Sequence, residues 1–131
     1  MKTVTAIAIL LGLLSLANGV FMLTAPEPWY WAIPGVPDRG AFNQHFIRDI
    51  GFIYVLIGAT FSYGAVYARH RFQLWLLPTA WLALHAAFHV WEVAVGICGP
   101  ESLIEDFAGV TLPAVLAIGL TYQAFRSEHR A

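Results

Sequence analysis

The chain has 131 residues, of which 59% are hydrophobic and only 11% are charged. A soluble domain carries roughly 25% charged residues, so the composition excludes an ordinary soluble domain and places the chain among membrane proteins. The net charge is −1, and the lysines and arginines lie at the ends of apolar runs rather than in one patch, which argues against nucleic acid as a partner.

The first apolar run covers residues 4–23. It has the roughly 20 residues that a helix needs to cross the hydrocarbon of a bilayer. Lys2 before this run and the small residues 17–19 near its end are also typical of a cleaved signal peptide, and that alternative stays open. The length of the run favours a retained helix over the shorter apolar core of a signal peptide.

A second apolar run covers residues 44–67 and follows residues 24–43, which carry four prolines and predict a loop. The loop contains Trp29, Tyr30 and Trp31, which are typical of an aromatic belt at a membrane surface, with a lid over a site as the alternative. The run itself begins with a dense polar group. His45 and Asp49 share one face of a helix, and Arg48 lies about 100° from Asp49.

The third run, residues 72–97, is apolar except for a group of ionisable residues in its middle. The spacing of His85, His89 and Glu92 is i, i+4 and i+7, which puts them on one helical face together with Trp81. Ionisable side chains at membrane depth are unfavourable unless they face a bundle interior or a water-filled cavity. This stripe therefore indicates a functional site.

The fourth run covers residues 107–125, and short polar turns precede the third and fourth runs. Four spans with short connections predict an all-α integral membrane four-helix bundle in up-down-up-down order, forming a single domain. Five of the seven lysines and arginines fall on one side of this arrangement, so both termini are predicted to be cytoplasmic. Small residues predict close helix packing in the first two spans, at Ala8, Gly12, Ser15, Gly19, Gly51, Gly58 and Ala59. Prolines predict bends in the last two spans, at Pro78 and Pro113.

Polar groups from different spans lie at similar depths in the outer half of the membrane. At 1.5 Å per residue, Asn18, Asp49 and Glu92 each lie about 8 Å below the outer ends of their spans, and His89 lies about 12 Å below. If the polar stripes of the second and third spans face each other, they form one site. The catalytic candidates are Asp49, Glu92 and His89, and the ligand-binding candidates are His45, Arg48, His85, Asn18 and Trp81.

Three interpretations of this polar layer stay open. The first is a pocket for a small or lipid-soluble ligand such as a quinone, with proton-transfer or redox chemistry. The second is a structural ion-pair network in a non-catalytic subunit. The third is a metal or proton carrier, in which His85, His89 and Glu92 supply two nitrogen donors and one oxygen donor to a transition metal. The single cysteine, Cys98, excludes an internal disulfide and is expected to be an apolar filler.

The four spans, the proline-rich first outer loop and the segment 45–51 (HFIRDIG), followed by Tyr54, resemble the small bacterial membrane proteins grouped as DoxX-like. The resemblance implies a protein of the bacterial inner membrane. Some members of that group are linked to membrane redox enzymes as small subunits, which implies an accessory role. The expected partners are the lipid bilayer and either a larger membrane complex or further copies of this chain.

Overall fold

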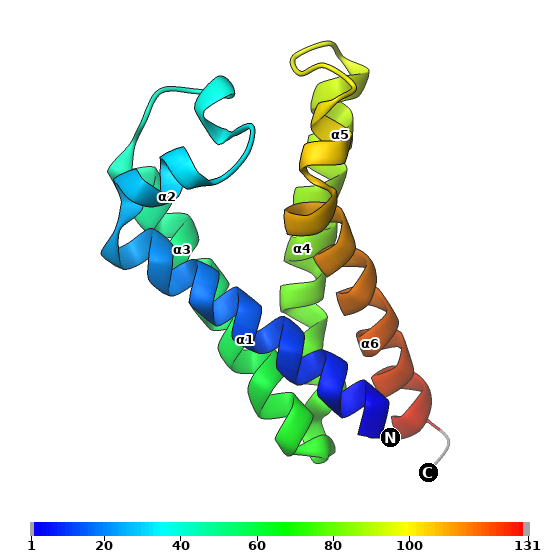
Figure 1. Ribbon diagram of the computed structural model, residues 1–131. Helices are drawn as coiled ribbons and strands as arrows, with labels where there is room; N and C mark the ends of the chain where they lie inside the picture. The colour runs from blue at the N-terminus through cyan, green and yellow to red at the C-terminus, as the bar shows by residue number, and fades with distance from the viewer. Residues whose placement is uncertain (1, 130–131) are drawn as a thin grey trace.

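The computed structural model describes residues 2–129, and all regular structure in this part of the chain is helical (Figure 1). The long helices are α1 (Lys2–Thr24), α3 (Gln44–Val66), α4 (Arg71–Ala94) and α6 (Leu112–Glu128), and the π-helical turn η3 (Phe107–Thr111) leads directly into α6. Four segments are long and apolar enough to cross a membrane: Lys2–Thr24, Gln44–Val66, Ala68–Ala94 and Phe107–Glu128. The prediction of an all-α fold with four long apolar helices is confirmed.

Helices α1 and α3 pack closely because glycines face each other across the contact. A Cβ atom on Gly12 would lie 2.9 Å from the carbonyl oxygen of Gly58, and one on Gly19 would lie 2.7 Å from that of Gly51. Only glycine leaves room for such an approach of two backbones. Close packing of small residues is therefore confirmed at these four positions, whereas Ala59 is exposed.

Helices α4 and α6 form a second pair, which a buried hydroxyl contact joins. The Oγ1 atoms of Thr79 and Thr121 are 2.7 Å apart, and each also lies 3.4 Å from a backbone carbonyl oxygen of the facing helix. Pro78 lies inside α4 and lacks the N–H that would continue its hydrogen-bond ladder. Pro113 lies in the first turn of α6, where proline is tolerated and where the chain changes from π to α geometry.

One hydrophobic core joins all four long helices. Its buried residues are Ala8, Leu11, Ile57, Phe61, Ala65, Trp75, Leu82, Ala114, Ala117, Leu120 and Ala124. Two side chains of α4 also donate hydrogen bonds to backbone carbonyl groups in the second half of α3. Trp75 Nε1 donates to the carbonyl of Thr60 at 3.2 Å, and Arg71 donates to those of Gly64 and Ala65 at 2.8 and 2.9 Å. The bonds from Arg71 satisfy carbonyl groups that the last turn of a helix leaves free.

The two helix pairs diverge at one end of the molecule, which we call the open end (Figure 1). At the opposite, closed end the start of α1 and the end of α6 lie together, and successive long helices run in opposite directions. A separate small core at the open end of the α1/α3 pair joins Met22 of α1 and Ile47 of α3 to Tyr30 of the short helix α2 (Pro26–Ala32). The molecule is therefore a bundle at its closed end and two splayed helix pairs at its open end.

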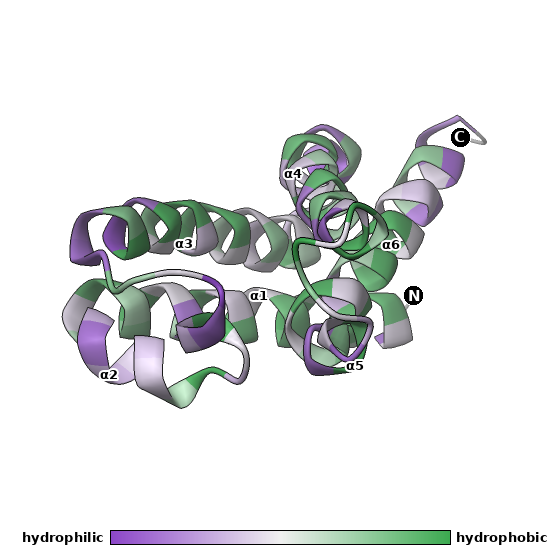
Figure 2. Cartoon of the chain, turned by 90° about the horizontal axis from the view of Figure 1, so that it is seen from above, coloured by the Kyte–Doolittle hydropathy of each residue, from purple (hydrophilic) through white to green (hydrophobic). Residues whose placement is uncertain are grey.

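Both connections at the open end contain helices where the sequence predicted a loop or a turn. The first holds α2 and the 3₁₀ turn η1 (Val36–Asp38), and the second holds α5 (Ser102–Glu105); at the closed end the 3₁₀ turn η2 (Ala68–His70) joins α3 to α4. Helix α2 forms in a proline-rich segment because its prolines lie in the first turn, where no N–H is needed. Figure 2, seen from the open end, shows that hydrophilic residues gather in these connections and at the start of α3.

Helix α4 ends at Ala94, three residues before the predicted end of the third span. Gly96 adopts the left-handed conformation with φ 77°, and the Ile97 N–H donates to the carbonyl of Glu92 at 2.9 Å. This is a Schellman motif, which terminates a helix where glycine follows its last residues. The chain then turns back toward α5.

Candidate functional site

The carboxylate of Asp106 lies at the open end of the molecule between Arg39 and His89. Arg39 Nη1 donates to Asp106 Oδ1 at 2.6 Å, and His89 Nδ1 lies 2.7 Å from Asp106 Oδ2. The exposed fractions of the three side chains are 17% for Arg39, 8% for Asp106 and 15% for His89. Among residues 2–129, Asp106 is the one charged residue that is buried. The three residues come from distant segments, so the contact joins both connections at the open end to α4.

The backbone around Asp106 places its side chain toward α4. Asp106 follows the single turn of α5 and directly precedes η3. Its carbonyl accepts hydrogen bonds from the N–H groups of Val110 at 2.8 Å and Thr111 at 3.2 Å, and the second of these is the bond of a π-helical turn. Short π-helical turns occur often at functional sites. Here the turn anchors the junction that holds the carboxylate.

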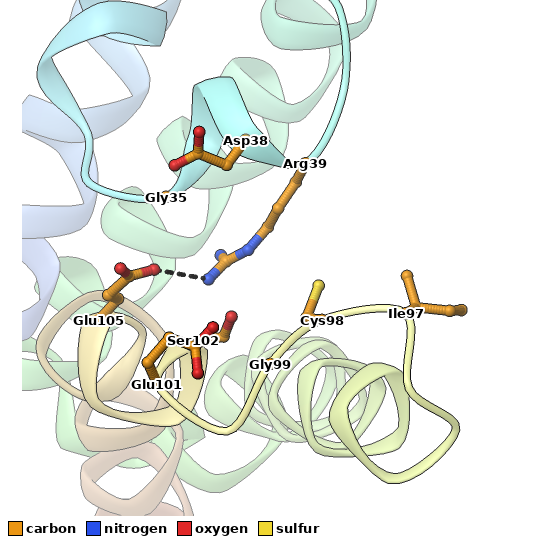
Figure 3. Close-up of a pocket in the computed structure, with 9 residues that line it drawn as sticks. All are labelled: Gly35, Asp38, Arg39, Ile97, Cys98, Gly99, Glu101, Ser102 and Glu105. Carbon is orange, nitrogen blue, oxygen red and sulfur yellow. Dashed lines mark hydrogen bonds and ion pairs between the residues drawn. The ribbon is translucent and has the colours of Figure 1, made fainter.

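A glycine allows the two connections at the open end to approach each other. Gly35 has φ 76°, and a Cβ atom on it would lie 2.5 Å from Glu105 Oε2 and 3.0 Å from Arg39 Nη2. Figure 3 shows the Arg39 guanidinium reaching across to Glu105, whose Oε2 is 3.4 Å from Arg39 Nη2. Beside this contact lies a pocket of about 260 Å³, lined also by Asp38, Cys98, Glu101 and Ser102.

The charges around Arg39 determine which atoms of Arg39, Asp106 and His89 carry protons. Burial alone would lower the pKa of Arg39, but the hydrogen bond and the negative charge of Asp106 raise it above its ordinary value. Arg39 is therefore a permanent cation that faces an acceptor carboxylate. Because a carboxylate has no proton to donate, the bond between His89 and Asp106 requires a proton on His89 Nδ1.

The other ring nitrogen of His89, Nε2, is then a hydrogen-bond acceptor in the neutral ring. No described residue forms a hydrogen bond with it. The His89 side chain is 15% exposed, so this free ring nitrogen is available to a group from outside the chain.

Aromatic rings continue from His89 along α4 toward the middle of the molecule. The His85 ring meets the His89 ring edge-on with centroids 4.7 Å apart, and it stacks on Trp81 at 4.9 Å. Trp81 in turn meets Tyr54 of α3 edge-on at 5.5 Å. The structure thus brings Trp81, His85 and His89 together on one side of α4, and the contact with Tyr54 shows that this side turns toward α3.

Two other predicted site residues, Glu92 and Asn18, do not contact His89 through hydrogen bonds. The half-buried side chain of Glu92 forms no hydrogen bond within residues 2–129. Asn18 Oδ1 accepts a hydrogen bond from Trp29 Nε1 at 2.9 Å, so Asn18 attaches α2 to α1 rather than facing His89.

Tyr30 is buried, and its hydroxyl donates to the carbonyl of Gly40 at 2.8 Å. Of the three aromatic residues expected in a membrane-surface belt, only Trp31 is exposed.

The polar group of α3 does not join this site. His45 Nε2 and Asp49 Oδ2 lie 3.3 Å apart, and their side chains are 87% and 60% exposed. Arg48 Nε donates to the carbonyl of Leu23 at 3.2 Å, at the end of α1. The expected meeting of two polar stripes is not formed, because α3 turns its glycines, Gly51 and Gly58, toward α1 and its polar stripe points outward.

The donor set predicted for a metal is not arranged as a metal site. Within the described part of the chain, no three His, Cys, Asp or Glu side chains are grouped closely enough to hold a metal ion, so His85, His89 and Glu92 do not converge. The nearest acidic partner of His89 is Asp106, which already bridges to Arg39.

Sequence reasoning missed Arg39 and Asp106 because both lie in segments that were predicted to be exposed connections. One signal was present. Arg39 is the only lysine or arginine in the two connections at the open end, and the other connection carries Glu101, Glu105 and Asp106. A lone cation opposite three acidic residues indicates an ion pair between the connections, although spacing alone does not select the acidic partner.

Comparison with protein-family models, with curated proteins and with solved structures finds no match for this chain. The resemblance to DoxX-like proteins therefore stays a prediction, and the candidate site rests on its geometry.

Proposed function

We propose that this protein is a multi-pass protein of the bacterial inner membrane that binds a small lipid-soluble ligand at His89. Both ends of the chain lie in the cytoplasm in this proposal. Lys2, Arg69, Arg71 and Arg126 all lie near helix ends at the closed end, which the positive-inside rule assigns to the cytoplasmic side. The open end and His89 are then close to the periplasmic surface.

The observation that carries the binding proposal is the hydrogen bond between His89 and Asp106. It orients the imidazole ring, selects the tautomer with the proton on Nδ1, and leaves Nε2 without a hydrogen-bond partner among residues 2–129. The order of groups, carboxylate to Nδ1 and a free Nε2, is the same as in catalytic sites where a histidine accepts a proton from a hydroxyl. A ligand that complements this acceptor carries a hydroxyl group.

The aromatic rings next to His89 further restrict the chemical class of the ligand. The centroid of the His85 ring lies 4.7 Å from that of His89, and the centroid of the Trp81 ring lies 4.9 Å from that of His85. The side chains of His85 and Trp81 are both partly exposed. Flat aromatic groups pack well on such rings. An aromatic hydroxyl compound with an apolar tail, such as a reduced quinone, fits both the acceptor and the rings. If the hydroxyl gives its proton to Nε2, the Asp106 carboxylate stabilises the imidazolium that results.

Binding to nanodisc-embedded protein tests this proposal. The probe is ubiquinol-1 under anaerobic conditions, compared with its dimethyl ether, which has no hydroxyl to donate. We expect ubiquinol-1 to bind at least about tenfold more tightly, equivalent to about 1.4 kcal/mol, because one hydrogen bond to a preorganised acceptor is lost in the ether.

The decisive variant is His89→Asn, whose side-chain amide can still donate to Asp106 but has no atom at the position of Nε2. We expect it to fold like the parent and to bind both compounds equally weakly. His70→Asn, in the exposed turn between α3 and α4, is the matched control and should bind like the parent. Equal affinity of the parent for the two compounds, or unchanged binding by His89→Asn, would refute the proposal.

A second candidate function is that of a non-catalytic subunit in a larger membrane redox complex. The same Arg39–Asp106–His89 contact supports it, because the contact ties three segments together and could have only a structural role. This candidate predicts that a second membrane protein co-purifies in a fixed ratio in mild detergent, and that ubiquinol-1 binds the isolated chain no better than its ether.

A further inference from the structure

Helix α3 carries an exposed stripe along its whole length. The stripe consists of His45, Asp49, Phe52, Leu56, Ala59 and Tyr63, all of which are exposed. The exposed fractions of the large apolar members are 59% for Phe52, 65% for Leu56 and 55% for Tyr63. The spacing alternates between four and three residues, which is the 3.5-residue period of helices that pack side by side with a left-handed twist.

The rest of this chain does not cover the stripe. Helix α3 meets α1 through Gly51 and Gly58, and it meets Trp75 of α4 through Phe61 and Gly64. These contacts use the opposite side of the helix. The stripe is therefore exposed along the whole length of the helix, and no other long helix of residues 2–129 covers it.

The polar end of the stripe distinguishes it from a face that only contacts lipid. Asp49 lies about 8 Å along a helix of 23 residues, whose length of about 35 Å exceeds the hydrocarbon thickness of about 30 Å by only a few ångströms. Ionisable groups at that depth normally face protein or water. By contrast, the exposed residues in the middle of α4 are apolar, for example Leu77 at 78% and Leu84 at 72% exposure, and lipid alone suits them.

We propose that the α3 stripe is the interface with a second copy of this chain. Two copies in one membrane share the same orientation, so their α3 helices run parallel around a two-fold axis along the membrane normal. The 3.5-residue period then sets Asp49 of one copy against His45 and Asp49 of the other. The two acids and two imidazoles form a reciprocal group, so each copy supplies both the acidic and the basic partner. This inference is independent of the ligand proposed at His89.

Disulfide trapping tests the interface in the full-length protein. In a Cys98→Ser background, single cysteines are placed on the stripe by Leu56→Cys or Ala59→Cys, and on the control face by Leu84→Cys. A disulfide requires Cα atoms within about 7 Å of each other. Oxidation of native membranes with copper phenanthroline should convert most of the two stripe variants to covalent dimers and leave Leu84→Cys monomeric.

The role of the polar group is tested by exchanging charges and measuring the dimer fraction by light scattering in detergent. His45→Asp places four carboxylates together, and we expect at least a tenfold weaker dimer. Adding Asp49→His to that variant restores two acids and two imidazoles, and we expect it to restore the dimer. A monomeric parent, or equal trapping at Leu56→Cys and Leu84→Cys, would overturn the proposal. So would a stripe cysteine that cross-links only to a different protein.

Discussion

Asp106 shows how a single carboxylate can be buried at the open end of a helical bundle. A buried charge is unfavourable unless it is paired and hydrogen-bonded, and Asp106 has a separate partner for each oxygen. Arg39 supplies a permanent charge, and His89 supplies a directed N–H. Removing either partner leaves the carboxylate under-compensated, and this penalty usually exceeds the net stabilisation that the intact pair provides.

We therefore expect Arg39→Met to destabilise the protein by about 1–3 kcal/mol, since Asp106 stays buried with one partner fewer. Cys98, the single cysteine, lines the pocket beside Arg39 and reports directly on this contact. Its rate of reaction with a fluorescent maleimide during heating should give a lower unfolding midpoint for Arg39→Met. Arg69→Met, at an exposed position of η2, should leave the midpoint nearly unchanged; an equal loss in both variants would contradict a specific role of Arg39.

The pKa of Arg39 also predicts how its contribution to stability depends on pH. The pKa of Arg39 is raised in the folded protein, so its contribution is fully present below the ordinary arginine pKa and is lost only as the pH rises through the higher folded value. The difference in unfolding midpoint between the parent and Arg39→Met should thus be the same at about pH 8 and about pH 10. A difference that disappears over this interval would show that another group supplies the stabilisation.

Among the helices, the α1/α3 pair depends most directly on the absence of side chains. A Cβ atom on Gly58 would lie 2.6 Å from the Gly12 carbonyl oxygen and 2.6 Å from the Leu16 nitrogen. Both are backbone atoms, which cannot move aside as a flexible side chain can. The two helices must then separate along their contact, and dispersion attraction falls steeply with such a gap.

Gly58→Ala should therefore destabilise the protein by about 1–3 kcal/mol, the usual range for overpacking. Gly119→Ala on α6 is a matched control, because a Cβ atom there meets no atom within 4 Å. That substitution should be neutral or stabilise by up to about 1 kcal/mol, since alanine favours helix. Unfolding midpoints of both variants in the same detergent check the prediction; a stable Gly58→Ala variant would disprove the close backbone contact.

The whole molecule is asymmetric from end to end. All four long helices meet in one core at the closed end, whereas at the open end the two pairs are linked mainly through their connections, by Arg39, Glu105 and Asp106. Side chains of α3 and α4 near the divergence, Tyr54 and Trp81, keep the pairs in contact midway. This arrangement leaves the proposed binding residues accessible, while the closed end maintains the fold.

The proposed orientation predicts which positions a membrane-impermeant maleimide can reach in intact cells. In a Cys98→Ser background, Gly40→Cys at the open end should be labelled from outside, because nothing lies within 4 Å of its Cβ position. Ser127→Cys, near the end of α6, should react only after the membrane is permeabilised. The reverse pattern would invert the orientation, and labelling of both positions in sealed cells would argue against a membrane crossing.

Local patterns were enough to predict the four long helices, because apolar runs near 20 residues and proline or glycine breaks act over a few neighbouring residues. They also placed Trp81, His85 and His89 on one side of α4, since helical spacing is a local property. Tertiary structure decided which side of α3 turns inward. That helix has both a glycine face and a polar face, and the fit of Gly58 against Gly12 selects the first. Tertiary structure also decided the partner of Arg39: Asp106 lies 67 residues away, and only the packing of whole helices brings the two connections together.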